Sequence, residues 1–346
     1  MRLLDAMPRP TTKDLAKAAG VSLATVDRVL NGREGVKQNT VDRVNHAIAT
    51  LGFVRNLQAA NLAKSQTYRF IFALPRSGGQ FLEQIIQRIK EAAVVYSADH
   101  VWCEVQYIDE NDPHSIATYL ASLAKKDVAG VAIMSPETPQ VRDAIMRLQE
   151  RGVAVLPFVS NQTKMDADWV GIDNQAAGAT AGLLLGQCSG GRTGSIMVIS
   201  ERMQSRDSME RRLGFDKEIN ENFPNLRGLP SLETYGNEER ARSIIAINLR
   251  VNPDIIGIYV MASEARMPLS ILAALGIDPA IIKIAHERTP FTEQALRDRS
   301  LDGVIAQDAG HLVRVAIRRL KGIVDRRQTV ESQEEIRIDI LLRSNI

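Results

Sequence analysis

From Arg69 onward the sequence alternates short β-rich runs with amphipathic segments, and this order constrains the fold more than any other feature. Apolar residues recur at helical spacing between the runs, for example in 81–93, 115–125, 176–186 and 237–249. A β-α-β-α order predicts parallel strands, because the crossover helices pack on both faces of the sheet. The β-rich runs are RFIFAL (69–74), VWCEVQYI (101–108), GVAIM (130–134), AVLPFV (154–159), GSIMVIS (194–200), IIGIYV (255–260), IIKIAH (281–286) and GVIA (303–306).

The number of runs predicts two lobes rather than one sheet, because eight strands in a chain of 346 residues exceed one ordinary domain. A further run, EIRIDILL (335–342), alternates apolar and polar residues over most of its length, which is typical of an edge strand. We therefore expect an α/β body at 68–346 with two doubly wound parallel sheets. The N-lobe comprises about 68–173 and 307–328, and the C-lobe about 174–306 and 329–346.

The segment before the body predicts a small all-α domain at 1–55. Thr11 is a plausible N-cap with Asp14 three residues on, and this first helix stops at Gly20. Ser22 caps a second helix that ends at Asn31-Gly32. A third helix ends at Gly52 and carries one apolar stripe, formed by Val41, Val44, Ile48 and Leu51. Two helices joined by the tight turn AAGVS are typical of a helix-turn-helix.

Charge is distributed unevenly along the chain. Residues 1–64 hold 10 Lys/Arg against 5 Asp/Glu, a net charge of +5, whereas the remainder holds 33 against 36, a net charge of −3. A basic head on a slightly acidic body indicates that the head meets a polyanion. The pattern of the second helix also favours binding to a polyanion. Val26, Val29 and Leu30 form its core side, and Ala24 and Arg28 face outward with Leu23 and Thr25 beside them.

In the major groove, Arg28 would pair with guanine, and Leu23 and Ala24 would contact thymine methyl groups. Ser22, Thr25 and the first backbone N–H groups would contact phosphates. The alternative is a helical hairpin of another kind, in which Arg28 is solvated.

The stretch TTKDLAKAAGVSLATVDRVLNG closely resembles the head of the lac-repressor-like (LacI/GalR) regulators. The stretch NLQAANLAKSQT resembles their hinge helix, which we place with its linker at 56–67, and the body resembles their effector domain, shared with periplasmic sugar-binding proteins. Two departures stand out: Asp27 replaces the usual serine, and Arg55 replaces a proline before the hinge. The resemblance implies a set of DNA-binding residues, namely Thr11, Thr12, Ser22, Leu23, Ala24, Thr25, Arg28, Asn31, Asn56, Ala59 and Leu62, the last a wedge in the minor groove.

Small molecules bind two-lobed α/β domains at the carboxyl ends of the strands, where polar residues cluster in this sequence. Glu287 and Gln307 each follow a β-rich run, and Arg211 stands three residues before a glycine, as the resemblance requires. Glu264 stands near the place of an Asn-Asp pair in the family, so two carboxylates would suit a polyol or a cationic ligand. For each residue the alternative is an ordinary loop, cap or core role. The expected effector residues are Phe81 as an aromatic platform, Ser160, Asn161, Asn174, Arg211, Glu264, Glu287 and Gln307.

Other chemistry has little support. Cys103 and Cys188 form no CxxC, the five histidines lack metal-ligand spacing, and CSGGRTGS lacks the lysine of a phosphate loop, which favours a helix-to-strand turn. We expect no catalytic residues, no cofactor and no metal. No apolar run reaches the roughly 18 residues of a membrane span, and MRLLDAMPRP lacks a signal-peptide core, so we expect a cytoplasmic protein without a membrane partner.

These features predict a sequence-specific transcriptional regulator, a repressor of sugar or polyol utilisation genes under the control of a carbohydrate-like effector. One helix-turn-helix contacts one half-site, so we expect a homodimer on a palindromic stretch of double-stranded DNA. Effector binding should close the lobes, and the sequence leaves open whether this releases DNA or promotes binding. The alternatives are a sugar-processing enzyme or a transport binding protein that carries an accessory DNA-binding head.

Overall fold

The structure, a computed structural model, describes residues 10–30, 35–53, 67–162, 169–327 and 335–346. The chain divides into two units, Met1–Gln66 and Thr67–Ile346, which are described separately. The hinge helix and linker predicted for 56–67 lie outside the described residues, apart from Thr67.

The head contains the three expected helices: α1 (Thr12–Ala19), α2 (Leu23–Leu30) and α3 (Gln38–Leu51). The N-cap prediction at Thr11 is confirmed, because its hydroxyl accepts from the amide of Asp14 while the Asp14 carboxylate accepts from the amide of Thr11. Gly20 and Gly52 end α1 and α3 in the left-handed conformation. A small core closes between the helices around Leu15, Val26, Val44 and Phe53.

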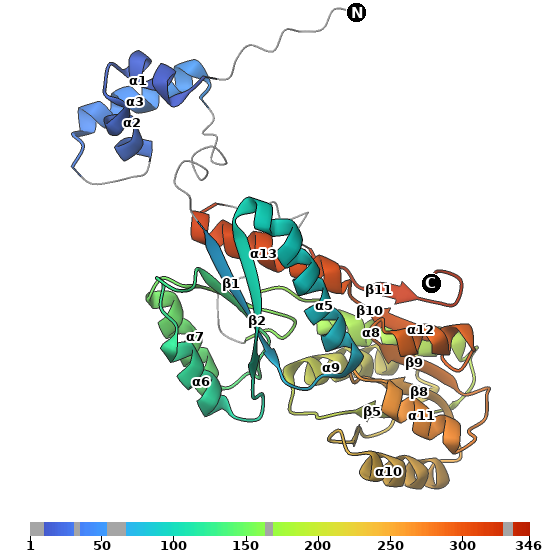
Figure 1. The fold of residues 1–346 in the computed structure, drawn as a ribbon. Helices are drawn as coiled ribbons and strands as arrows, with labels where there is room; N and C mark the ends of the chain where they lie inside the picture. The colour runs from blue at the N-terminus through green and yellow to red at the C-terminus, as the bar shows by residue number, and fades with distance from the viewer. Residues whose placement is uncertain (1–9, 31–34, 54–66, 163–168, 328–334) are drawn as a thin grey trace, which may run out of the picture. The chain divides into compact units, whose positions relative to one another are not determined.

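The N-lobe contains a parallel sheet in the order β2-β1-β3-β4. Its strands are β1 (Tyr68–Pro75), β2 (Val101–Ile108), β3 (Gly130–Ile133) and β4 (Ala154–Pro157). One face packs against α5 (Gly79–Tyr96) and α13 (Ala309–Asp325), and the other against α6 (Pro113–Ser122) and α7 (Pro139–Glu150), as Figure 1 shows. A short 3-10 turn, η1 (Ser97–Asp99), joins α5 to β2. The sheet is therefore covered by helices on both faces.

The C-lobe contains a sheet in the order β11-β10-β9-β8-β5-β6, with β7 paired to β5. Helices α8 and α9 cover one face, and α10, α11 and α12 cover the other. The helices are α8 (Asn174–Cys188), α9 (Arg206–Asn222), α10 (Glu238–Val251), α11 (Arg266–Ala274) and α12 (Pro290–Arg297). The strands are β5 (Gly194–Ser200), β6 (Leu226–Gly228), β7 (Leu232–Glu233), β8 (Ile255–Val260), β9 (Ile282–His286), β10 (Gly303–Ala306) and β11 (Asp339–Leu341).

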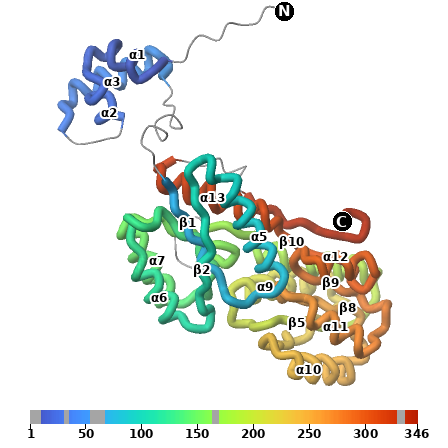
Figure 2. Tube along the Cα trace, viewed as in Figure 1, coloured from blue at the N-terminus to red at the C-terminus, as the bar shows by residue number. Residues whose placement is uncertain are grey.

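The chain passes between the lobes three times: between β4 and α8, between β10 and α13, and between α13 and β11. Figure 2 traces the chain through the N-lobe elements β1, β2, α5, α6, α7 and α13 and the C-lobe elements α9, α10, α11 and α12. The predicted α/β class with two helix-covered parallel sheets is confirmed, and each of the eight β-rich runs forms a strand. Strand β11 pairs antiparallel with β10 at the sheet edge, as its alternating pattern predicts. Gly190 and Gly191 of CSGGRTGS lie in the predicted turn between α8 and β5, and Gly194 begins β5.

Candidate functional site

Helix α2 presents the side chains that the sequence assigns to DNA. Val26 is 1% exposed and anchors the helix in the head core, whereas Leu23, Ala24 and Arg28 are exposed. Arg28 makes no hydrogen bond or ion pair among the described residues of the head, so its guanidinium is free to meet a base or a phosphate.

The start of α2 is held by the hydroxyls expected there. The Ser22 hydroxyl accepts from the amide of Thr25 at 3.1 Å, and the two hydroxyls lie 2.9 Å apart. Thr11 and Thr12 are exposed at the start of α1. Fixed caps leave the remaining first-turn N–H groups of α2 in place for phosphate contacts, although the DNA roles of these residues remain predictions.

Sequence reasoning missed the residue that fixes the turn between α1 and α2. Arg43, on α3, donates from Nε and Nη2 to the carbonyl of Ala19 at 3.1 and 2.7 Å, and from Nη2 to that of Gly20 at 2.8 Å. This contact joins residues far apart in the chain, so no local pattern reveals it. The remaining predicted DNA-binding residues, Asn31, Asn56, Ala59 and Leu62, lie outside the described residues.

The C-lobe brings four of the predicted effector residues together. Nε of Arg211 donates to Asn174 Oδ1 at 2.9 Å, and Nη2 donates to Glu287 Oε1 at 3.2 Å. Gln307 Nε2 donates to the same Glu287 oxygen at 3.1 Å. Arg211 also donates from Nη1 to the carbonyl of Met261 at 2.9 Å. We call Asn174, Arg211, Glu287 and Gln307 the polar cluster; its members are 4%, 4%, 1% and 3% exposed.

Two glycines allow the helices that carry this cluster to touch. A Cβ on Gly178 would overlap the backbone of Arg211, and a Cβ on Gly214 would overlap the backbone of Gln175. Helices α8 and α9 therefore pack backbone against backbone, which brings Asn174 and Arg211 within hydrogen-bonding distance. Glu287 and Gln307 follow β9 and β10, two neighbouring parallel strands, so their side chains meet at one sheet edge.

Glu287 combines a strained backbone, a shifted pKa and a buried oxygen without a partner among the described residues, three features that are typical of functional positions. Its φ of +66° is left-handed, a conformation that costs energy for a residue with a side chain. Burial raises the pKa of the Glu287 carboxyl, and the Arg211 cation and the Gln307 amide oppose that rise. Within the described residues Glu287 Oε2 and Gln307 Oε1 have no hydrogen-bond partner, so the cluster offers two buried acceptors to a ligand that donates.

Beside the cluster lies a buried pair that sequence reasoning did not assign. The Tyr259 hydroxyl and Nε2 of His286 are 2.7 Å apart, and both side chains are fully buried. Burial, together with the Arg211 cation, holds the pKa of His286 well below its usual value, so the ring is neutral.

The other predicted effector residues lie elsewhere. Phe81 is 3% exposed and packs in the N-lobe core, and Glu264 accepts from backbone amides of Gln80 and Arg266. Ser160 and Asn161 are half-buried in the segment that leaves β4, and Asn161 Oδ1 accepts from its neighbour Gln162. The structure shows none of these four in contact with the polar cluster, so their effector roles remain predictions.

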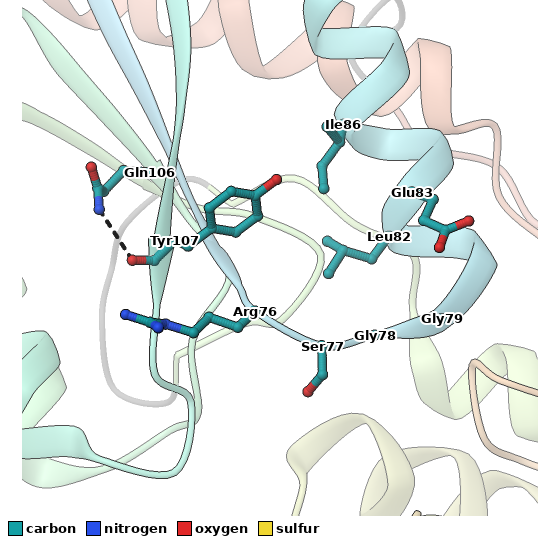
Figure 3. A pocket seen from close by; sticks show the side chains of 9 residues that line it. All are labelled: Arg76, Ser77, Gly78, Gly79, Leu82, Glu83, Ile86, Gln106 and Tyr107. Atoms are coloured by element: carbon teal, nitrogen blue, oxygen red, sulfur yellow. Dashed lines mark hydrogen bonds between the residues drawn. The ribbon is translucent and has the colours of Figure 1, made fainter.

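A cavity of about 680 Å³ lies on the N-lobe between α5 and β2 (Figure 3). Its lining comprises Arg76, Ser77, Gly78, Gly79, Leu82, Glu83, Ile86, Gln106 and Tyr107, none of which is a predicted effector residue. The polar cluster, unlike this cavity, unites buried, convergent polar groups at strand ends, where two-lobed α/β domains bind small molecules. The cavity is lined by residues of the N-lobe alone, several of them exposed.

Neither a candidate metal site nor a candidate membrane span occurs among the described residues. In those parts of the chain, no group of three or more His, Cys, Asp or Glu is placed to hold a metal ion. None of the helices described there is long and apolar enough to cross a membrane.

The fold and these two sites define a two-lobed ligand-binding domain that follows a helix-turn-helix head. Comparison with protein-family models agrees: residues 70–328 match the periplasmic binding protein domain, and residues 11–56 match the bacterial regulatory proteins of the lacI family. The chain therefore belongs to the periplasmic binding protein domain family and carries a lacI-family DNA-binding head.

Curated relatives include a transcriptional regulator and a catabolite control protein. The chain is 34% identical over 136 residues to the HTH-type transcriptional regulator RegA of Clostridium saccharobutylicum, covering 39% of each chain. It is 27% identical over 168 residues to the catabolite control protein A of Staphylococcus xylosus, covering 48% of this chain and 49% of the relative. The matches thus span about half the length of these relatives or less.

Solved structures share the fold. A glucose-galactose binding protein, GanP from Geobacillus stearothermophilus, superposes with a TM-score of 0.70 at 15% identity, covering 81% of this chain and 99% of that one. A putative LacI transcriptional regulator from Bacteroides fragilis also gives 0.70, at 18% identity, covering 81% and 98%. At these identities the similarity concerns the fold alone.

Proposed function

We propose that the protein is a sequence-specific transcriptional regulator, a repressor of sugar or polyol utilisation genes controlled by a carbohydrate-like effector. One observation carries the proposal: the same chain holds, on a helix-turn-helix, an exposed Arg28 that has no partner among the described residues, and it holds a buried polar cluster at strand ends. The first suits a DNA groove, and the second suits a small polar molecule. The regulator relatives RegA and catabolite control protein A support the combination.

For the head, we assign base contacts to Leu23, Ala24 and Arg28, with hydroxyl and backbone contacts to phosphate at the start of α2. Because one head covers one half-site, the working form is a homodimer on a palindromic operator. Exposed apolar side chains on the body offer surface for the dimer: Trp102 on the edge strand β2 and Val94 and Val95 on α5 are 57%, 76% and 70% exposed. A protein that binds operators acts in the cytoplasm, on the nucleoid.

For the body, the two unpartnered acceptors, Glu287 Oε2 and Gln307 Oε1, favour a ligand rich in hydroxyl donors. That chemistry fits a sugar or a polyol. The described residues favour an effector over catalysis at the cluster: its ionisable residues bond one another, and the neutral His286 bonds a tyrosine rather than a nucleophile. The alternative of a transport binding protein is disfavoured, because transport does not require a DNA-binding head.

The DNA-binding part is tested by selecting binding sites from random duplex DNA. We expect the wild type to enrich a two-fold-symmetric sequence, and Arg28→Ala to lose that preference because the guanine contact is gone, at roughly 1–3 kcal/mol per base contact. Arg250→Ala, which removes an exposed arginine at the end of α10, is the matched control and should select the wild-type sequence. Enrichment of the same site by Arg28→Ala would contradict the assignment of α2 to the groove.

The effector is sought with a thermal-shift screen of sugars, polyols and their phosphates. A ligand present at about 100 times its Kd adds about 2.7 kcal/mol of stability and raises the melting temperature. Gln307→Ala should reduce the shift, whereas Gln294→Ala, an exposed glutamine on α12, should not. An effector that shifts Gln307→Ala as much as the wild type would remove Gln307 from the site.

A further inference from the structure

The backbone that leads into α2 is bonded to a side chain of α3. Nε and Nη2 of Arg43 donate to the carbonyl of Ala19 at 3.1 and 2.7 Å, and Nη2 also donates to the carbonyl of Gly20 at 2.8 Å. Ser22, whose hydroxyl caps α2, follows Gly20 by two residues. We call these three bonds the turn clamp, because they fix the turn before α2 to α3.

The clamp uses carbonyls that α1 cannot satisfy itself. The last carbonyls of a helix have no intrahelical donor, and the amides of Gly20 and Val21 turn back to carbonyls earlier in α1. The carbonyls of Ala19 and Gly20 accept from the guanidinium instead. Hydrogen bonds from a charged donor are stronger than neutral ones, and a cation is favoured at the negative end of the α1 dipole. The clamp is therefore a strong contact for its size.

Helix α2 has few other contacts that could fix its direction. It is eight residues long, about 12 Å, and all eight are described. Val26 is the one residue of α2 that is buried, and Val29 and Leu30 pack beside it while staying partly exposed. One buried anchor fixes the position of a helix but leaves it able to pivot. The turn clamp supplies a second fixed point, at the end of the helix where Leu23 and Ala24 lie.

We propose that Arg43 is a positioning residue for base recognition by α2. It acts through the turn clamp rather than on DNA, and the inference rests on the proposed DNA-binding function. Base contacts need a geometry held within about 0.5 Å and 10–20°, whereas phosphate contacts carry no sequence information and involve long, adaptable cationic side chains. Loss of the clamp should therefore lower the affinity for the selected symmetric duplex and spare the affinity for random DNA.

Binding of the full chain to the selected duplex and to a random duplex of equal length, at several salt concentrations, tests the proposal. Arg43→Met keeps an apolar stem and loses all three bonds. We expect the ratio of the two affinities to fall about 5- to 150-fold, the discrimination that one bidentate base contact provides. The affinity for random DNA should stay within about twofold of the wild type. Its salt dependence should be unchanged, because no phosphate contact is lost.

Two further variants separate the clamp from the charge. Lys17→Met removes a positive charge from the last turn of α1 without touching the clamp, and it should keep the wild-type ratio. Arg43→Lys keeps the charge, but an ammonium lacks the planar fork that serves both carbonyls. We expect Arg43→Lys to give a ratio between those of Arg43→Met and the wild type.

Hydrogen exchange in peptides containing Leu15 and Val44, which are buried in α1 and α3, reports whether the head stays folded. An unchanged ratio in a folded Arg43→Met would overturn the proposal. So would a salt slope reduced by about one, because Arg43 would then contact a phosphate itself.

If Arg43→Met loses this protection, Arg43→Lys decides. A folded head with the wild-type ratio overturns the proposal, and a folded head with a reduced ratio supports it. Loss of protection in both variants would show that Arg43 is needed for folding rather than for positioning. A wild type without preference for any duplex would instead contradict the proposed function.

Discussion

The polar cluster makes a strong prediction for Arg211→Met, which keeps an apolar stem and removes the guanidinium. The wild-type group donates to Asn174, to the Met261 carbonyl and to Glu287, and both members of the ion pair are almost wholly buried. Removing one partner of a buried pair leaves the other charged and unpaired, which costs about 3–5 kcal/mol. We expect a loss of this size in the free energy of unfolding at pH 7.

The loss should depend on pH with a definite sign. Burial already raises the pKa of Glu287, and without the Arg211 cation it rises further. When the pKa of Glu287 is higher in the folded state than in the unfolded state, the unfolded chain loses this proton first as the pH rises. The free energy of unfolding of Arg211→Met is therefore higher at low pH and falls toward pH 7. Each pH unit between the two pKa values is worth about 1.4 kcal/mol, so the penalty should shrink by up to about 2.7 kcal/mol between pH 7 and pH 5.

Urea unfolding followed by circular dichroism at pH 7 and pH 5 measures both effects. The double variant Arg211→Met with Glu287→Gln is the matched control, since it removes the stranded charge; it should be more stable than the single variant at pH 7 and lose its pH dependence at this site. The reasoning is refuted if Arg211→Met costs less than about 1 kcal/mol at pH 7. It is also refuted if the cost is the same at both pH values.

Two further predictions concern the supports of the cluster. Gly214→Ala places a methyl group against the backbone of α8, so it should destabilise the protein by about 1–3 kcal/mol in urea and weaken effector binding, whereas Gly191→Ala at an open turn should disturb effector binding little. Burial lowers the pKa of His286 below 6.5, so as pH falls through 6.5 only the unfolded chain gains this proton and stability is lost. The wild type should lose about 1 kcal/mol more than His286→Gln between pH 6.5 and pH 5.5, and equal losses would show that His286 takes up the proton when folded.

Much of the fold could be predicted because its signals are local. Eight β-rich runs became strands, and the caps at Thr11 and Ser22 followed from residue type alone. Strands β6 and β7 were missed, because two or three residues are too few to show a period. The order of strands within each sheet could not be predicted from the sequence either, because it depends on pairing between segments that are distant in the chain.

The candidate site was predictable in part for the same reason. Glu287 and Gln307 follow strands, and parallel strands bring their ends to one edge. The bond from Arg211 to the Met261 carbonyl was not predictable, because it joins α9 to the end of β8, 50 residues further along the chain. Glu264 also stands at a strand end, but only the three-dimensional arrangement shows that the opposite lobe engages it. Sequence position alone does not distinguish a ligand contact from an interlobe contact.

The central claim is that a ligand bound in the body controls the affinity of the head for DNA. One titration tests this claim most directly. The affinity for the selected symmetric duplex is measured with and without an effector found in the thermal screen, for the wild type and for Gln307→Ala. We predict that the effector changes the wild-type affinity about 5- to 150-fold. Gln307→Ala should bind DNA normally without effector and respond only at higher effector concentration. An unchanged wild-type affinity at saturating effector would contradict the account.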